Sequence, residues 1–428
     1  MEVLSATDQK KEAFLKGIAA ACETPLSMGA TQLREAAMAT LESQPVPTTR
    51  SEAWKYTRVT RLIGKTWNKG EAQENATEYF VPEVNGWNIV FVNGQFDAAQ
   101  STMPDAAGLT VMTMADALKA GKLDAQWGSL TQQQSDWFEA LNMAFATDGL
   151  YIHLEAKTAI DRPIYLLHLT TGDATAVVSR NFIQVEKGAN LTVVQHAVSA
   201  EGTSAYVNIV NEHFVADNAQ FNFEKIQDEA GEIYHHSTEW AEQTRDSRYD
   251  IRSITLQGHW VRNNLNIRVN GENCGTNLYG SYMPNGKEHI DNHTMVDHLI
   301  PHCESNEVYK GIVNDKSTAV FNGKVFVRPD AQKTNAFQQN ANIVLSDDAE
   351  MYSKPELEIY ADDVKCSHGS TTGQFDEEAV YYLRARGIGE QSARMLLVQA
   401  FVADVMDAIS NDALRDYCLN KLQERASA

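Results

Sequence analysis

A cysteine and a histidine lie two residues apart in the stretch DDVKCSHGST, at residues 362–371. Alternate side chains of a β-strand point to the same face, so Val364, Cys366 and His368 would share one face of a strand. A thiolate and an imidazole are both ligands of iron and other transition metals. The pair is therefore either two adjacent metal ligands or part of an ordinary buried strand, because free cysteines are commonly buried as small apolar residues.

A second group of ligand-type residues lies in the stretch HIDNHTMVDHLIPHC, which contains His289, His293, His298, His302 and Cys303. Their number would suffice for a zinc site. Strand alternation places His293 and His298 on opposite faces, however, and the spacing matches no recognised zinc motif. We expect these histidines to form hydrogen bonds between successive coils of a stacked β fold or at an interface with a partner.

Other catalytic motifs are absent from the sequence. It contains no G-x-x-x-x-G-K-[ST] motif, so any ATP that the protein's function uses must bind to a partner. It contains neither the G-x-S-x-G motif of hydrolases nor the H-E-x-x-H motif of zinc proteases. No acidic pair is distinguishable as a general acid and base, and the sequence therefore predicts no catalytic residue.

Composition restricts the partners and the compartment. The 428 residues have a formal net charge of −21, which opposes binding to nucleic acid and to anionic membranes. The longest apolar runs are too short for a membrane span, and the N-terminal residues lack the pattern of a secretory signal. The five scattered cysteines form no C-x-x-C motif, which is typical of a reducing compartment. We therefore expect a cytoplasmic protein.

The elements that must position the Cys366–His368 pair are short strands. Between residues 149 and 372, alternating strands follow one another, separated by polar turns with a small central residue. Several of these turns recur 27 to 30 residues apart: Gly188-Ala189-Asn190, Asn218-Ala219-Gln220, Asp246-Ser247-Arg248, Asn273-Cys274-Gly275 and Asp348-Ala349-Glu350. Such recurrence favours a β-solenoid, while a β-sandwich would have turns every 8–12 residues over a shorter span.

Helical spacing flanks this region on both sides. Residues 1–148 contain amphipathic segments and some strand, so we interpret them as an α-rich N-terminal domain. Residues 373–428 begin with acidic residues, reach a glycine at Gly387 and continue with apolar residues at helical spacing. They predict a C-terminal helical domain after a solenoid core at 149–372.

Several stretches near the C-terminus resemble one protein family. The motifs FNGKVFV, AQKTNAFQQN, KPELEIYADDVKCSHG and DEEAVYYLRARGI are similar to the core of the SufB/SufD family, which comprises scaffolds of SUF iron–sulfur cluster assembly. The stretch SEAWKYT near position 51 resembles the SufD branch. The resemblance implies a mainly β fold, a right-handed parallel β-helix flanked by N-terminal and C-terminal helical domains.

The resemblance also implies a function and partners. It implies a non-catalytic scaffold that pairs with SufB through the β-helix and with the SufC ATPase through the C-terminal helices. It implies His368 as a ligand of a nascent, transient iron–sulfur cluster at the partner interface, with Cys366 as a weaker candidate. It leaves open whether the complex binds a flavin and whether the isolated chain forms a homodimer. Two alternatives remain: a purely structural interaction subunit without cluster ligation, and a β-helix carbohydrate-active enzyme.

Overall fold

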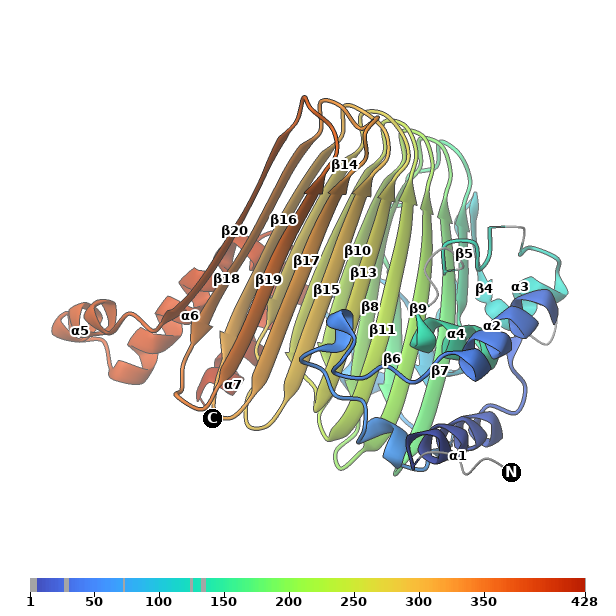
Figure 1. Cartoon of the computed structure of the whole chain (residues 1–428), viewed down its shortest axis with the longest axis horizontal. Helices are drawn as coiled ribbons and strands as arrows, with labels where there is room; N and C mark the ends of the chain where they lie inside the picture. Colours follow the sequence, from blue (N-terminus) through green and yellow to red (C-terminus); the bar gives the residue numbers. More distant parts are fainter. Residues whose placement is uncertain (1–5, 27–30, 72–73, 124–125, 132–135, 428) are drawn as a thin grey trace.

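The computed structural model describes residues 6–26, 31–71, 74–123, 126–131 and 136–427. Within the expected N-terminal domain, residues 1–5, 27–30, 72–73, 124–125 and 132–135 lie outside these ranges. Strands dominate the described part of the chain, and they stack into a β-solenoid of about 8 turns (Figure 1). The predicted β-helix is therefore confirmed, and the alternative of a sandwich of antiparallel sheets is excluded.

Two long parallel sheets form the walls of the solenoid. We name the first the N-sheet; its solenoid strands are β5 Leu150–Leu154, β7 Thr175–Val185, β9 Ser204–Val215, β11 Glu232–Gln243, β13 Trp260–Val269, β15 His289–His298, β17 Thr318–Val327 and β19 Glu350–Ile359. We name the second the C-sheet; its solenoid strands are β6 Ile164–Thr170, β8 Asn190–Ser199, β10 Gln220–Asp228, β12 Arg248–Gln257, β14 Gly275–Tyr282, β16 Glu304–Val313, β18 Asn335–Val344 and β20 Lys365–Gln374. Each coil contributes one strand to each sheet.

Short strands from the first part of the chain extend both sheets. In the N-sheet, β4 Leu109–Thr113 pairs with β5, and β1 Asn68–Lys69 pairs with β7. In the C-sheet, β2 Trp87–Val92 pairs in parallel with β6, and it forms a hairpin with β3 Gln95–Phe96. The stack therefore begins within the region that the sequence assigns to the N-terminal domain, and it ends at Gln374.

The turns before the C-sheet strands explain the recurrence seen in the sequence. Gly188, Asn218, Asp246 and Asn273 all adopt positive φ, between 57° and 66°, where glycine, asparagine and aspartate are tolerated best. The small residue that follows each of them is buried, so successive coils place small side chains above one another. Two later turns continue the row at His302 and Lys333, which adopt φ of 63° and 61°. Histidine is enriched at positive φ, whereas lysine is not.

The interior of the solenoid, here called the lumen, is filled by alternate side chains from both sheets. Aliphatic and aromatic residues form its largest cluster, including Ile183, Leu191, Phe223, Leu265 and Val296. Stacked side chains one coil apart bury one another, because neighbouring strands lie about 4.8 Å apart. The lumen is thus a packed core whose contacts join residues about 30 positions apart in the chain.

Helices cover the outer faces of the two sheets. The N-terminal helices are α1 Ala6–Ala21, α2 Thr31–Ser43, α3 Met114–Lys119 and α4 Trp137–Phe145, and their apolar residues join outward-facing residues of the N-sheet in one core cluster. The C-terminal helices are α5 Glu377–Ala385, α6 Glu390–Met406 and α7 Asp412–Ser427. Helices α6 and α7 pack on the C-sheet, whereas α5 projects beyond β20 (Figure 1). Among the described helices, none has the length and apolar character of a membrane span.

Candidate functional site

The last coil leaves one end of the solenoid open. β19 pairs only with β17, and β20 pairs only with β18, so each of these two strands has one edge without a strand partner in the described chain. Nearly every residue of β20 is exposed, and the residues of β19 are mostly half-buried. The N-terminal helices lie toward the opposite end of the stack (Figure 1). A sheet edge of this kind is a ready template for pairing with another chain.

Cys366 and His368 lie on this edge strand, and both belong to its lumen-facing row. In the register, Cys366 pairs with Ala336 and His368 pairs with Gln338, and both of these β18 partners are buried in the lumen. The intervening residue of β18, Phe337, is exposed on the outer face. The predicted shared face is therefore present, at the open end of the lumen.

The two side chains differ in their surroundings. Cys366 is half-buried and packs on an apolar cluster that includes Val325 and Ala336, and this burial raises the pKa of its thiol. His368 is exposed. Because the thiolate is the form that binds metal, a thiol with a raised pKa is the poorer ligand. The arrangement thus makes the His368 side chain more accessible than the Cys366 thiol to a metal ion that approaches from solvent.

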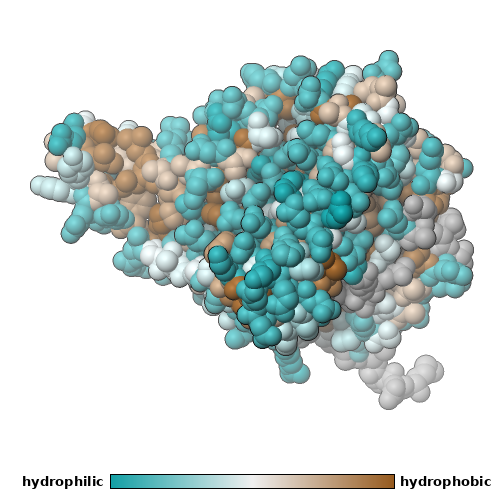
Figure 2. Space-filling view, turned by 90° about the horizontal axis from the view of Figure 1, so that it is seen from above, coloured by the Kyte–Doolittle hydropathy of each residue, from teal (hydrophilic) through white to brown (hydrophobic). Residues whose placement is uncertain are grey.

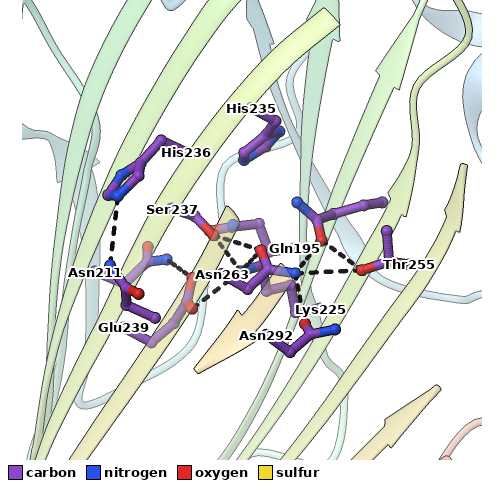
Figure 3. A network of polar contacts seen from close by, with 12 residues as sticks. Gln195, Asn211, Lys225, His235, His236, Ser237, Glu239, Thr255, Asn263 and Asn292 are labelled. Atoms are coloured by element: carbon purple, nitrogen blue, oxygen red, sulfur yellow. Dashed lines mark hydrogen bonds and ion pairs between the residues drawn. The ribbon is translucent and has the colours of Figure 1, made fainter. Parts of the chain in front are cut away.

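Polar side chains run through the middle of the lumen below this end. The largest group centres on Lys225, whose ammonium contacts Ser237, both carboxylate oxygens of Glu239 at 2.9 Å and Asn263 Oδ1 at 3.0 Å (Figure 3). Asn263 also donates to Asn292 Oδ1 at 3.0 Å on the next coil. Strand alternation could have placed each residue on the inner face, but it could not show which residues meet across coils.

A smaller polar group lies nearer the open end. Gln338 donates through Nε2 to Glu307 Oε2 at 2.8 Å, and Thr294 donates through its hydroxyl to Glu307 Oε1 at 2.6 Å. Burial raises the pKa of the Glu307 carboxyl to about 7. Gln338 is the register partner of His368, so this group lies one coil below the candidate ligand. Sequence reasoning did not identify it.

The second group of histidines makes ordinary structural contacts. His298 faces the lumen, and its Nε2 lies 2.9 Å from Ser305 Oγ on the neighbouring C-sheet strand. His293 faces outward, and its Nε2 lies 3.0 Å from Asp291 Oδ1. His289 Nε2 lies 2.9 Å from Thr57 Oγ1 of the N-terminal segment. The expected hydrogen bonds between coils are not seen for these three histidines, whose contacts lie within β15, between two strands of one coil, or with the N-terminal segment. The described residues contain no cluster of three or more ligands around a common point.

A groove lies elsewhere, on the outer face of the N-sheet. It has a volume of about 530 Å³ and lies between the segment Glu52–Trp54 and strands β13, β15, β17 and β19 of the N-sheet. The three lysine and arginine side chains that line it are each paired with a carboxylate: Arg262 with Asp291, Lys324 with Glu358, and Lys354 with Glu52. Its positive charges are therefore already neutralised by the chain itself.

A second exposed surface lies on the C-terminal helices. Tyr381 and Tyr382 of α5 are 74% and 58% exposed, and Leu396 of α6 is 46% exposed. The projecting part of the molecule carries a hydrophobic patch with hydrophilic residues around it, seen at the left of Figure 2. Aromatic residues exposed together on a projecting element are typical of a protein interface.

Comparisons with known proteins agree with the geometry. A family model described as SUF system FeS cluster assembly, SufBD core domain, matches residues 168–401, and a model of the SufBD protein N-terminal region matches residues 16–166. The chain is similar to an iron–sulfur cluster assembly SufBD family protein of Synechocystis sp., with 33% identity over 88% of this chain and 86% of the relative. It is also similar to the iron–sulfur cluster assembly protein SufD of Escherichia coli, with 31% identity over 89% of each chain. A chloroplastic protein of Arabidopsis thaliana is 27% identical over 93% of this chain and 86% of the relative.

Proposed function

This chain belongs to the SufBD family of SUF iron–sulfur cluster assembly proteins, and we propose that it is a non-catalytic scaffold subunit that pairs with a SufB-type scaffold through the open end of its solenoid. The observation that supports this most is the exposed edge strand β20, which has His368 on its lumen-facing row. A second solenoid that added its own terminal strands there would continue both sheets and cover both edges.

In the proposed complex, His368 is a ligand of a nascent iron–sulfur cluster. A neutral imidazole can replace one of the thiolates that usually bind cluster iron. The exposed position of His368 at the seam would let a cysteine of the partner complete the site. The cluster is the cargo of the complex, and a site divided between two subunits suits a cargo that must leave. Cys366 has a lesser role because its thiol is half-buried and has a raised pKa.

We further propose that the projecting part of the C-terminal helices binds a SufC-type ATPase. The exposed Tyr381, Tyr382 and Leu396 provide an apolar surface, and the sequence has no P-loop of its own. The five cysteines are unpaired, which supports a reducing compartment such as the cytoplasm. Flavin binding by the complex and homodimer formation by the isolated chain stay part of this proposal, and each is testable with purified protein.

The first experiment replaces His368 with alanine and monitors three properties separately. We expect His368→Ala to fold and to copurify with the SufB-type partner, because the side chain is exposed and β20 pairs through its backbone. We expect it to lose most of its support of iron–sulfur enzymes in cells that depend on this pathway. Ser367→Ala, which changes the exposed neighbour on the outer row, is the control.

The outcomes separate the proposal from the alternatives. Normal iron–sulfur enzyme activity with His368→Ala would mean that the subunit is purely structural. Loss of copurification together with loss of activity would mean that His368 serves the pairing rather than the cluster. Cleavage of a polysaccharide by the purified chain would favour the alternative of a carbohydrate-active enzyme.

The second experiment tests the ATPase surface. Deleting residues 373–428 would uncover the apolar outer face of the C-sheet, including Ile226 and Ile312, because α6 and α7 cover it. The exposed side chains are therefore the better target. We expect Tyr381→Ala combined with Leu396→Ala to weaken ATPase binding roughly tenfold or more. The control Met103→Ala changes an apolar residue that is 42% exposed elsewhere. Unchanged affinity in a pull-down titration would refute the assignment.

A further inference from the structure

One buried side chain lies directly below the candidate ligand in the lumen. Gln338 on β18 is in register with His368 on β20, and it is 3% exposed. Ala336 and Asn340, two residues to either side on the same strand, are also buried, so Gln338 belongs to the lumen-facing row. Side chains stacked on adjacent parallel strands are close enough for a direct contact.

The amide of Gln338 has a defined orientation. Its Nε2 donates to Glu307 Oε2 at 2.8 Å, and Glu307 Oε1 accepts from the Thr294 hydroxyl at 2.6 Å. Above the pKa of about 7 that burial gives Glu307, its carboxylate is ionised and only accepts hydrogen bonds, so the opposite orientation would place two acceptors against each other. Gln338 Nε2 therefore donates to Glu307, and Gln338 Oε1 is the acceptor that can bind another group.

Packing fixes the position of the amide group. A Cβ at Gly323 would lie 2.4 Å from Gln338 Nε2 and 2.9 Å from its Cδ, so the amide occupies space that any larger residue at position 323 would need. The glycine on β17 thus leaves room for the amide inside the lumen.

The remaining acceptor has no partner. Oε1 of Gln338 is buried and accepts no hydrogen bond from the described residues. Native proteins leave few buried polar atoms unpaired, because such an atom has lost its water without gaining a partner. The side chain stacked above it is the imidazole of His368, which is exposed and has no hydrogen bond to the described residues, so its ring can turn toward the lumen.

We propose that Gln338 is a positioning residue for His368. Its Oε1 accepts a hydrogen bond from one ring N–H of the imidazole and so keeps the other ring nitrogen unprotonated and directed outward at the open end. Histidines that bind metal commonly donate their second ring N–H to an oxygen acceptor, which fixes the tautomer and the orientation of the ring. The role of this hydrogen bond in metal binding rests on the proposed function. The hydrogen bond itself can be measured without a cluster or a partner.

The experiment measures the tautomer of His368 in the full-length chain. Histidine labelled with ¹⁵N and long-range ¹H–¹⁵N correlation spectra report which ring nitrogen is protonated, and His368→Ala assigns the signal among the 12 histidines. The spectra are recorded at pH 8, above the pKa of about 7 of Glu307, so that its carboxylate is ionised. We expect one tautomer to exceed the other about tenfold in the unchanged protein.

Two variants and a control test the cause. Gln338→Leu removes the acceptor and should give a mixed population of tautomers. Gln339→Leu changes the same residue type at the neighbouring exposed position of β18 and should leave the single tautomer unchanged. The double variant Gln338→Glu with Glu307→Gln reverses the donor and the acceptor of the buried pair, keeps an oxygen below His368 and should restore the single tautomer even where Gln338→Leu folds poorly.

The results that would refute the role of Gln338 differ from those that would refute the proposed function. A mixed population in the unchanged protein, or a single tautomer that persists in Gln338→Leu, overturns the role of Gln338 whatever the fate of clusters in cells. Conversely, normal cluster assembly with His368→Ala overturns the proposed function and leaves the tautomer measurement as it stands. If the role of Gln338 and the proposed function are both correct, Gln338→Leu should reduce iron–sulfur enzyme activity in cells, and Gln339→Leu should not.

Discussion

The ion pair of Lys225 and Glu239 in the lumen provides the most direct test of how the solenoid interior is stabilised. Both side chains are 1% exposed. Burial lowers the pKa of Lys225, and the neighbouring carboxylate of Glu239 opposes that shift. We expect Lys225→Met to be severely destabilising, because methionine fills a similar volume but leaves the Glu239 carboxylate buried without a cation.

The magnitude follows from the contacts that are lost. The ammonium contacts four oxygen atoms, on Ser237, Glu239 and Asn263, and a methionine side chain donates no hydrogen bond to any of them. Breaking one side of a buried ion pair costs about 3–5 kcal/mol. Adding Glu239→Gln removes the orphaned charge and keeps an oxygen for the Asn211 amide, which donates to Glu239 Oε1 at 3.1 Å. The double variant should therefore regain at least half of the lost free energy of unfolding.

Urea denaturation at pH 7, followed by tryptophan fluorescence and circular dichroism, measures this free energy. Lys316→Met is the control, because its partner Asp348 is 3.4 Å away and both side chains are 67% exposed. An exposed pair of this kind contributes about 1 kcal/mol or less. If Lys225→Met cost no more than the control, or if the double variant were no more stable than the single one, the reasoning about the buried charge would be wrong.

Two further predictions concern acid and the buried cysteines. Burial lowers the pKa of His213 from 6.5 to about 3 and that of His298 from 6.5 to about 4. As the pH falls below 6.5, these histidines are therefore protonated in the unfolded chain before they are protonated in the folded one. The free energy of unfolding should therefore fall as the pH drops from 6.5 toward 4, and His298→Gln should flatten this profile in urea titrations by roughly 3 kcal/mol at pH 4. Cys274→Ala and Cys303→Ala should each cost at most about 2 kcal/mol, because both thiols are buried and donate to the Gly271 carbonyl. Thermal melting checks the stability, and a folded cysteine variant that failed specifically in cluster assembly would contradict the structural role of these thiols.

The sequence alone determined the path of the chain within each coil. Alternation of apolar residues predicted strands, and turns centred on residues such as Asn218-Ala219 and Asn273-Cys274 predicted the solenoid, because glycine, asparagine and aspartate tolerate positive φ. The shared face of Cys366 and His368 followed from the same alternation. These features depend on residues close together in the chain, so local spacing is enough to predict them.

The tertiary structure decided which residues meet across coils. Lys333 adopts the same positive φ as the predicted turns, although a lysine does not signal it, because the stacked coils on either side impose the conformation. Gln338 lies below His368 only because the intervening turns and β19 return the chain to the same register after 30 residues. The length of each coil is set by the packing of its neighbours, and the contacts inside the lumen are therefore a property of the assembled stack.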